Sequence, residues 1–143
     1  MTPILDLVTN FYNELWNKKN LKVANEILHE QVNFRGSLGN IMIGREKVLE
    51  YVREVTTSLD GYTCEIQDLV VENDKAAAIV QFRGTHVQEF MGYDPTGITV
   101  QWLGTAFFNC RDGLLTKIWV LGDLKGLEAD LAKNSDINRA NSV

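Results

Sequence analysis

Residues 98–123 read ITVQWLGTAFFNCRDGLLTKIWVLGD, with alternating apolar runs on either side of Asp112-Gly113. Alternation with a period of two is typical of a strand that buries one face, and Asp-Gly is a favoured two-residue hairpin turn. The stretch therefore predicts an antiparallel hairpin with strands over 98–110 and 114–123.

Two more strands precede this hairpin, over 62–72 and 76–88, and the Asn73-Asp74 pair between them suits a tight turn. The segment 93–97, YDPTG, predicts a longer irregular loop. Together the four strands predict one antiparallel meander. Strands of this length need bulges or strong twist, so the sheet is expected to curl and enclose a pocket.

The part of the chain before these strands has the spacing of amphipathic helices. Apolar residues recur every three or four positions over 4–16 and over 45–58, and a shorter helix is predicted over 21–28 before a short strand at 31–34. Helices first and sheet second predict an α+β fold, in which N-terminal helices pack against a curved antiparallel sheet. One or two helical turns are predicted over 125–133.

Length and composition predict one globular domain. The chain has 143 residues, of which 45% are hydrophobic and 23% charged, which is sufficient for a core without metals or disulfides. We expect a single domain over 1–132. The polar tail over 133–143 is expected to be flexible, because it has too little apolar content to order itself.

Charge and motif content argue against several kinds of partner. The net charge is −5 without a basic run, so neither nucleic acid nor a membrane is expected as a partner. No leader pattern and no apolar segment of about 18 residues occur, which favours a cytoplasmic location. Cys64 and Cys110 lack metal or redox spacing and are expected to be reduced. No phosphate-binding loop, GxSxG or HExxH motif occurs, so no cofactor and no metal are expected.

Asp123 is a candidate catalytic residue because it ends an otherwise apolar strand. The period of two places it on the same face as Trp119 and Leu121, so its carboxyl group should face whatever those side chains line. In a dry pocket, such a carboxyl group would suit the exchange of a proton near neutral pH. The alternative is that Asp123 caps the final helix, which is the commoner role for an aspartate at such a position.

His86 is the second catalytic candidate. It shares a face of its strand with Val80 and Phe82 and is a candidate proton carrier or orienting group. The alternative is a structural histidine whose ring is satisfied by hydrogen bonds, which is the commoner situation beside apolar residues.

Aromatic side chains on helices and strands could form a flat wall for a ring-shaped ligand, although most of them must belong to the core. The candidate ligand-binding residues are Trp16, Tyr12, Tyr51, Phe34, Arg35, Phe90, Trp102 and Trp119.

Four sequence blocks, taken in order, resemble the SnoaL-like polyketide cyclase and ester cyclase family of the NTF2-like superfamily. They are FYNELWN at 11–17, GRE at 44–46, RGTHVQEFMGYDPTG at 83–97, and FNCRDG at 108–113 with the following Trp119 and Asp123. The third block is the most specific, because Gly-Thr-His, Phe-x-Gly and Pro-Thr-Gly are hard to meet by chance at these spacings.

The resemblance implies an NTF2-like cone and a cofactor-independent reaction. Asp123 matches the acid/base aspartate of the family and His86 its pocket histidine. The implied reaction is an intramolecular aldol closure of a bulky, apolar or polycyclic carbonyl compound, in which the carboxylate takes an acidic proton and later returns one. The family therefore predicts a cyclase-like lyase or isomerase, and it also predicts a homodimer.

Two other functions stay open from the sequence. The domain could bind a small apolar molecule without catalysis, since no second catalytic carboxylate is evident. It could also be a protein-interaction module that uses the outer face of its sheet, in which case that face would matter more than Asp123.

Overall fold

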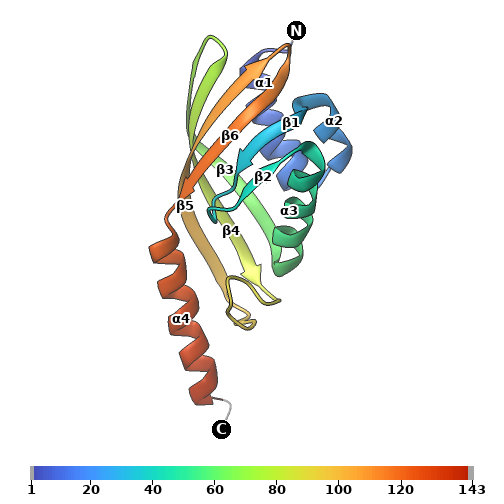
Figure 1. The fold of residues 1–143 in the computed structure, drawn as a ribbon. Helices are drawn as coiled ribbons and strands as arrows, with labels where there is room; N and C mark the ends of the chain where they lie inside the picture. Colours follow the sequence, from blue (N-terminus) through green and yellow to red (C-terminus); the bar gives the residue numbers. More distant parts are fainter. Residues whose placement is uncertain (1, 142–143) are drawn as a thin grey trace.

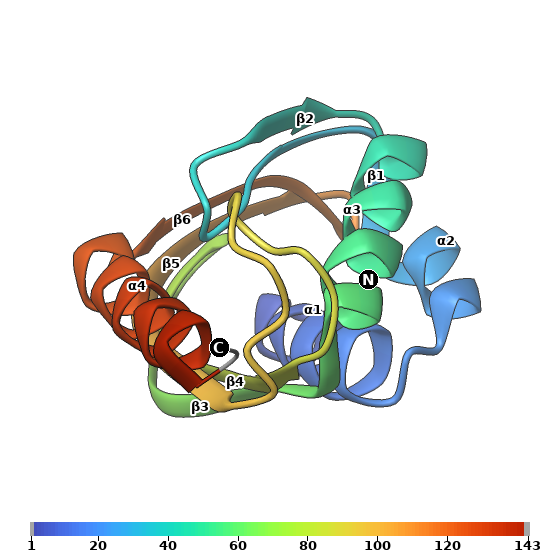
Figure 2. The ribbon, with the colours of Figure 1, turned by 90° about the horizontal axis from the view of Figure 1, so that it is seen from below.

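The computed structural model describes residues 2–141, with side chains described as far as residue 135. Six strands form one curved, open sheet, and the N-terminal helices pack against its concave side (Figures 1 and 2). The elements in chain order are α1 (Ile4–Asn10), η1 (Phe11–Asn17), η2 (Leu21–Val23), α2 (Ala24–Ile27), β1 (Leu28–Arg35), β2 (Ile41–Ile43), α3 (Arg45–Ser58), β3 (Leu59–Glu72), β4 (Lys75–His86), β5 (Thr99–Arg111), β6 (Leu114–Gly122) and α4 (Leu124–Asn141).

The sheet has the strand order β2-β1-β6-β5-β4-β3. The predicted meander is confirmed, because β3, β4, β5 and β6 pair antiparallel in sequence order. The six-stranded sheet as a whole is mixed, since β1 pairs in parallel with β6. A local pattern shows that a segment is a strand, but it does not show which distant segment will be its neighbour.

The curl expected of long strands is present. Strand β3 has register shifts against β4 between Asp60 and Thr63 and between Ile66 and Asp68. Such bulges increase local twist and bend the sheet. The concave face that results is lined by the inward-facing residues of β4 and β5, and these belong to one buried core.

The predicted N-terminal helix is present, but its second half, η1, is a π-helix. Its buried residues include Phe11 and Leu15, which face the concave side of the sheet. The side chain of Asn17 then donates to the carbonyl oxygen of Cys64 (2.9 Å) and accepts from its N–H (2.7 Å). Because β3 is an edge strand, Asn17 supplies Cys64 with the hydrogen bonds that a further strand would otherwise make.

Helix α3 has the bounds that the sequence predicts. Gly44 precedes it with a φ of 101°, a conformation that favours glycine. The guanidinium group of Arg45 donates to the carbonyl oxygen of Leu28 (2.9 Å) and to Asn25 Oδ1 (3.1 Å). The Gly-Arg-Glu block therefore joins α3 to the end of α2, and in this structure its first two residues have a structural role.

Helix α4 is longer than the predicted turns over 125–133 and contacts β5. Leu127 and Leu131 are fully buried. The outward-facing Leu103 of β5 stays 50% exposed whereas the inward-facing Val100 is buried, so α4 packs on the concave side, at the open end of the sheet (Figure 2). The flexibility of the polar tail stays a prediction. None of the described helices is both long and apolar enough to cross a membrane.

Candidate functional site

The sheet and the N-terminal helices enclose a small space, the inner cavity. Its volume is about 10 Å³, which is room for about one water molecule. Its lining residues are Phe11, Tyr12, Trp16, Phe34, Ser37, Tyr51, Tyr62, Phe82 and Val120. Four of the predicted ligand-binding residues, Tyr12, Trp16, Phe34 and Tyr51, therefore do face one cavity. Their rings and those of their neighbours fill most of the space that a ring-shaped ligand would need.

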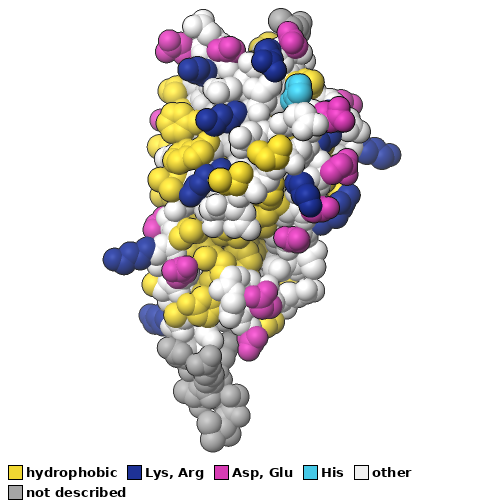
Figure 3. All heavy atoms as spheres, in the orientation of Figure 1, with side chains coloured by type: hydrophobic (Ala, Val, Ile, Leu, Met, Phe, Trp, Pro, Cys, Tyr) yellow, Lys and Arg dark blue, Asp and Glu magenta, His cyan; other side chains and the backbone are white. Residues whose placement is uncertain are grey.

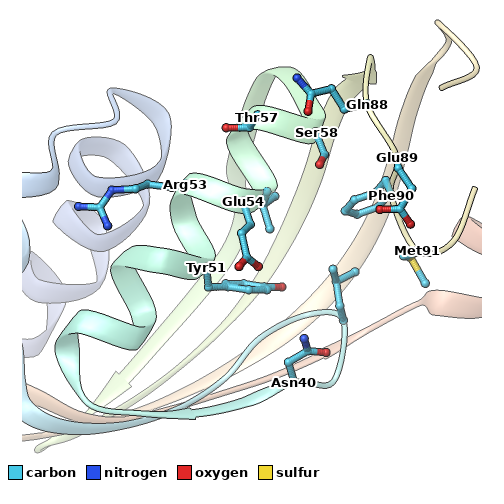
Figure 4. A pocket seen from close by; sticks show the side chains of 12 residues that line it. Asn40, Tyr51, Arg53, Glu54, Thr57, Ser58, Gln88, Glu89, Phe90 and Met91 are labelled. Atoms are coloured by element: carbon cyan, nitrogen blue, oxygen red, sulfur yellow. The ribbon is translucent and has the colours of Figure 1, made fainter. Parts of the chain in front are cut away.

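A larger open space, the outer pocket, lies beside the second half of α3. It has a volume of about 500 Å³, which is within the usual size of a small-molecule site. Helix α3, the β1–β2 loop and the β4–β5 loop form its walls (Figure 4). Its lining residues are Leu38, Asn40, Tyr51, Arg53, Glu54, Val55, Thr57, Ser58, Gln88, Glu89, Phe90 and Met91.

Tyr51 lines both spaces and separates one from the other. Its ring contacts Trp16 and Phe34 with centroid distances of 5.9 and 5.7 Å. Burial raises the pKa of Tyr51 to about 12, although hydrogen bonds with the side chain of Ser37 and the backbone of Leu38 act in the opposite direction. Tyr51 is therefore a neutral phenol held at the inner end of the outer pocket.

His86 ends β4 on the concave face, as the alternation predicts, and is fully buried. Its Nδ1 lies 3.0 Å from Thr96 Oγ1 and accepts the N–H of Thr96 at 3.2 Å. Burial lowers the pKa of His86, while the backbone carbonyls of Tyr93 and Gln88 and the carboxylate of Glu89 act in the opposite direction. The ring is therefore held neutral, and one of its two nitrogens is satisfied by the β4–β5 loop.

The lowered pKa of His86 predicts acid sensitivity. Below about pH 6.5 the unfolded chain binds a proton at His86 that the folded chain does not, so the free energy of unfolding should fall as the pH falls from 7 to 5. Thermal unfolding midpoints at pH 8, 7, 6 and 5 measure this for the wild type and for His86→Gln. The variant should show a shallower pH dependence in this range, and equal slopes would contradict the prediction.

Asp123 does not face either space. Its side chain is exposed, and Oδ1 accepts the N–H of Gly126 at 3.2 Å, in the first turn of α4. Asp123 therefore acts as the helix cap of the alternative prediction, and its carboxyl group does not face a pocket. The reason is strand parity: Gly122 packs on Ser37 beneath the β1–β2 loop, so the next residue points to the opposite side.

Trp119 and Arg35 lie on the outer face of the sheet, so their expected place in the pocket is wrong. The Arg35 guanidinium stacks on the Trp119 ring at 5.2 Å and donates to the carbonyl oxygen of Val120. Trp119 also meets the exposed Phe107 edge to face at 6.2 Å. The sequence places Asp123, Trp119 and Leu121 on a common face, but that face is the convex one.

Phe90 and Trp102 complete the predicted ligand-binding residues, and both are buried. Phe90 lines the outer pocket from the β4–β5 loop, whereas Trp102 lies behind it on the concave face of β5. Their ring centroids are 6.2 Å apart. Trp102 therefore lines neither space directly, and it also packs on Phe82, a residue of the inner cavity.

Glu54 and Glu89 are candidates that the sequence prediction missed. Both line the outer pocket, and the Glu54 carboxylate lies beside Tyr51 (Figure 4). Glu89 Oε1 already accepts the N–H of Gly92 at 2.7 Å, whereas no hydrogen bond within residues 2–135 engages the carboxylate of Glu54. A signal for Glu54 was present, because it follows Tyr51 by three positions on a helix and so shares its face.

Metal and thiol chemistry receive no support from the described residues. Among residues 2–135, no group of three or more histidine, cysteine, aspartate or glutamate side chains could hold a metal ion. Cys64 and Cys110 are free thiols, and burial raises the pKa of both. The polar groups that line the outer pocket are carboxylate, phenol, amide, hydroxyl and guanidinium groups.

A family model described as SnoaL-like polyketide cyclase matches residues 6–131. The chain belongs to the SnoaL-like polyketide cyclase family. No curated protein matches this SnoaL-like sequence. Solved structures do match it over nearly the whole fold. TsrD from Streptomyces laurentii is 25% identical, with a TM-score of 0.80 over 90% of this chain and 93% of that one.

Two further structures resemble this SnoaL-like chain closely. IdmH from Streptomyces antibioticus is 25% identical, with a TM-score of 0.77 over 89% of this chain and 96% of its own. A SnoaL-like polyketide cyclase from Agrobacterium tumefaciens is 18% identical, with a TM-score of 0.78 over 92% and 99% of the two chains, and it supports the fold alone. The NTF2-like architecture predicted from the sequence is confirmed.

Proposed function

We propose that this SnoaL-like chain is a cofactor-independent cyclase or isomerase that binds a bulky carbonyl compound in the outer pocket. The observation that carries the proposal is the position of Tyr51 and Glu54 in that pocket. A neutral phenol and a carboxylate lie side by side there, above apolar walls formed by Leu38, Phe90 and Met91 (Figure 4). Membership of a polyketide cyclase family supports a cyclase-type role.

The proposed reaction is an intramolecular aldol closure. A carboxylate takes a proton from the carbon beside a carbonyl group, and the resulting enolate carbon forms a bond to a second carbonyl carbon of the same molecule. The alkoxide formed there takes a proton back from the carboxylic acid, so no atom is lost and no cofactor is consumed. The pocket contributes by holding the two carbons close together.

Glu54 is the carboxylate that the geometry favours for this proton transfer. It faces the pocket, whereas Asp123, the residue that the family resemblance implies, caps α4 on the other side of the β1–β2 loop. Asp123 stays the alternative acid/base residue, and it would have to leave the N–H of Gly126 to act. His86, which lies behind Phe90, is proposed to assist by hydrogen bonding.

Deuterium exchange tests whether the pocket performs acid/base chemistry at all. The probe is 1-indanone, a planar bicyclic ketone, and the readout is the loss of its C2 proton signal in heavy water with and without the protein. Exchange that the protein accelerates supports the proposal. Binding of 1-indanone without accelerated exchange would favour the second candidate function, a non-catalytic small-molecule carrier, for which the use of Asp123 as a helix cap is the supporting observation.

We also propose that the outer face of the sheet pairs with a second copy of the chain. Apolar side chains gather along one side of the molecule, over β5 and β6 (Figure 3). The exposed apolar residues of this face include Ile79, Leu103, Phe107 and Leu121. Contiguous apolar surface of this kind is typical of an interface, and a second copy offers the same apolar face as a complement.

A homodimer is therefore expected in solution, and Leu103→Lys should convert it to a monomer by placing a charge in the interface. Light scattering coupled to size-exclusion chromatography measures the mass of both proteins. The matched control is Gln101→Lys, two residues away on the same face but at a polar position, which should perturb the dimer less. A wild-type monomer would contradict the homodimer. The exposed apolar face would then favour a different protein as its partner.

A further inference from the structure

Two buried N–H groups on the concave face of the sheet lack an acceptor. Trp102 Nε1 and His86 Nε2 have no hydrogen-bond partner among the described residues. Because His86 Nδ1 accepts the N–H of Thr96, the proton of the neutral ring is on Nε2. The indole of Trp102 can only donate. Both groups therefore require an acceptor, and a buried donor left without one is a cost to the folded state.

The β4–β5 loop supplies only an imperfect acceptor to His86. The backbone carbonyls of Gln88 and Tyr93 approach the ring closely enough to raise its pKa, but neither forms a hydrogen bond of good geometry with Nε2. These carbonyls belong to the same loop as Phe90. If that loop moves, the weak interaction is lost together with the cover that Phe90 provides.

Phe90 contacts the rings of both donors and also lines the outer pocket. Its ring centroid lies 6.2 Å from that of His86 and 6.2 Å from that of Trp102. On its other side the Phe90 side chain lines the outer pocket (Figure 4). Phe90 is therefore a ring that links the outer pocket with the rings of both His86 and Trp102.

The turn that carries Phe90 is closed on itself. Phe90 and Tyr93 exchange two backbone hydrogen bonds of 3.0 Å, and Glu89 accepts the N–H of Gly92. Met91 and Gly92 both have positive φ, 53° and 82°, as a tight turn of this kind requires. Because these bonds lie within 89–93, the turn can shift as one body without breaking them, at the cost of the weak interaction between the Tyr93 carbonyl and the His86 ring.

We propose that Trp102 Nε1–H and His86 Nε2–H form a subsite for a carbonyl oxygen, which a ligand reaches by displacing Phe90. The surrounding charges and rings define the ligand further. Glu54 and Glu89 line the pocket while the Arg53 side chain points away from its centre (Figure 4), so an anionic ligand is disfavoured. The occupant is therefore a neutral, planar carbonyl compound, and the inference rests on the outer pocket being the ligand site, as proposed above.

Binding of 1-indanone and indane, which has a methylene group in place of the carbonyl group, tests the subsite. Dissociation constants come from NMR titrations of the folded 143-residue chain. Trp102→Phe keeps an aromatic ring but removes the N–H, and it should weaken 1-indanone about tenfold more than it weakens indane. Phe90→Ala opens the subsite and should favour 1-indanone over indane by a similar factor relative to the wild type.

The result that overturns the subsite is an equal change for both ligands in these variants, or no binding of 1-indanone to either the wild type or Phe90→Ala. If Trp102→Phe does not fold, the Phe90→Ala comparison alone decides. These binding measurements need no turnover. The binding preference can therefore be observed without accelerated deuterium exchange, and accelerated exchange can be observed without the binding preference. The subsite and the proposed catalytic function are thus tested separately.

Discussion

Replacing Phe108 with alanine is expected to lower the free energy of unfolding by about 3–5 kcal/mol, the range for a large buried aromatic residue. Phe108 is only 1% exposed, and its ring packs edge to face on Phe11 (5.9 Å) and Tyr12 (6.0 Å). The truncation would leave a cavity between the sheet and η1, where the N-terminal helix packs on the sheet. Urea denaturation of the wild type and the variant measures the loss.

Phe107 is the matched control because it neighbours Phe108 on the same strand but points to the opposite face, where it is 55% exposed. Phe107→Ala should cost less than about 1 kcal/mol, as for most surface substitutions. If the outer face pairs two copies, this smaller effect should grow with protein concentration, whereas that of Phe108→Ala should not. Equal losses for the two variants would mean that the assignment of faces is wrong.

Glu54→Gln is expected to slow the protein-promoted deuterium exchange of 1-indanone at least about 100-fold, since a positioned general base contributes about 10²–10⁴-fold. The substitution keeps the size of the side chain and removes its ability to accept a proton from carbon. Glu54 is exposed on α3, so the fold should not change. Exchange rates measured by proton NMR, with thermal unfolding of each variant as a check, provide the comparison.

Asp123→Asn is the matched control for Glu54→Gln. Asparagine caps a helix about as well as aspartate, so α4 should stay in place and the exchange rate should stay within about threefold of the wild type. The reverse result, a large loss with Asp123→Asn and little with Glu54→Gln, would assign the acid/base role to Asp123 as the family resemblance implies. Asp123→Ala, by contrast, should cost about 1 kcal/mol of stability through the lost cap.

Local patterns predicted the elements of this fold well. The bounds of α3 and the meander from β3 to β6 follow from periodicity and turn residues, because each element is determined by neighbouring residues. Two features depend on long-range pairing and were not accessible in this way. They are the parallel contact of β1 with β6 and the three-residue strand β2, which is too short for a periodic signal.

In the strand that leads to Asp123, the alternation of residues does not identify which face is buried. Strand β6 is apolar on both faces through Ile118-Trp119-Val120-Leu121, so the pattern groups Asp123 with Trp119 without showing which group faces inward. The structure turns Ile118 and Val120 inward and leaves Asp123 outside. The outer pocket was not predictable either, because three segments distant in sequence form it, and only the spacing of Tyr51 and Glu54 gave a local signal.

The indole N–H signals of the protein test whether the ligand site is the outer pocket and its extension past Phe90. In a two-dimensional ¹H–¹⁵N NMR titration with 1-indanone, the side-chain signal of Trp102 should move downfield as its N–H gains an acceptor. The signal of Trp119, on the outer face, should stay unchanged. Movement of Trp119 and of the amide signals at the start of α4, with Trp102 and the backbone of Glu54 and Phe90 unaffected, would contradict the account.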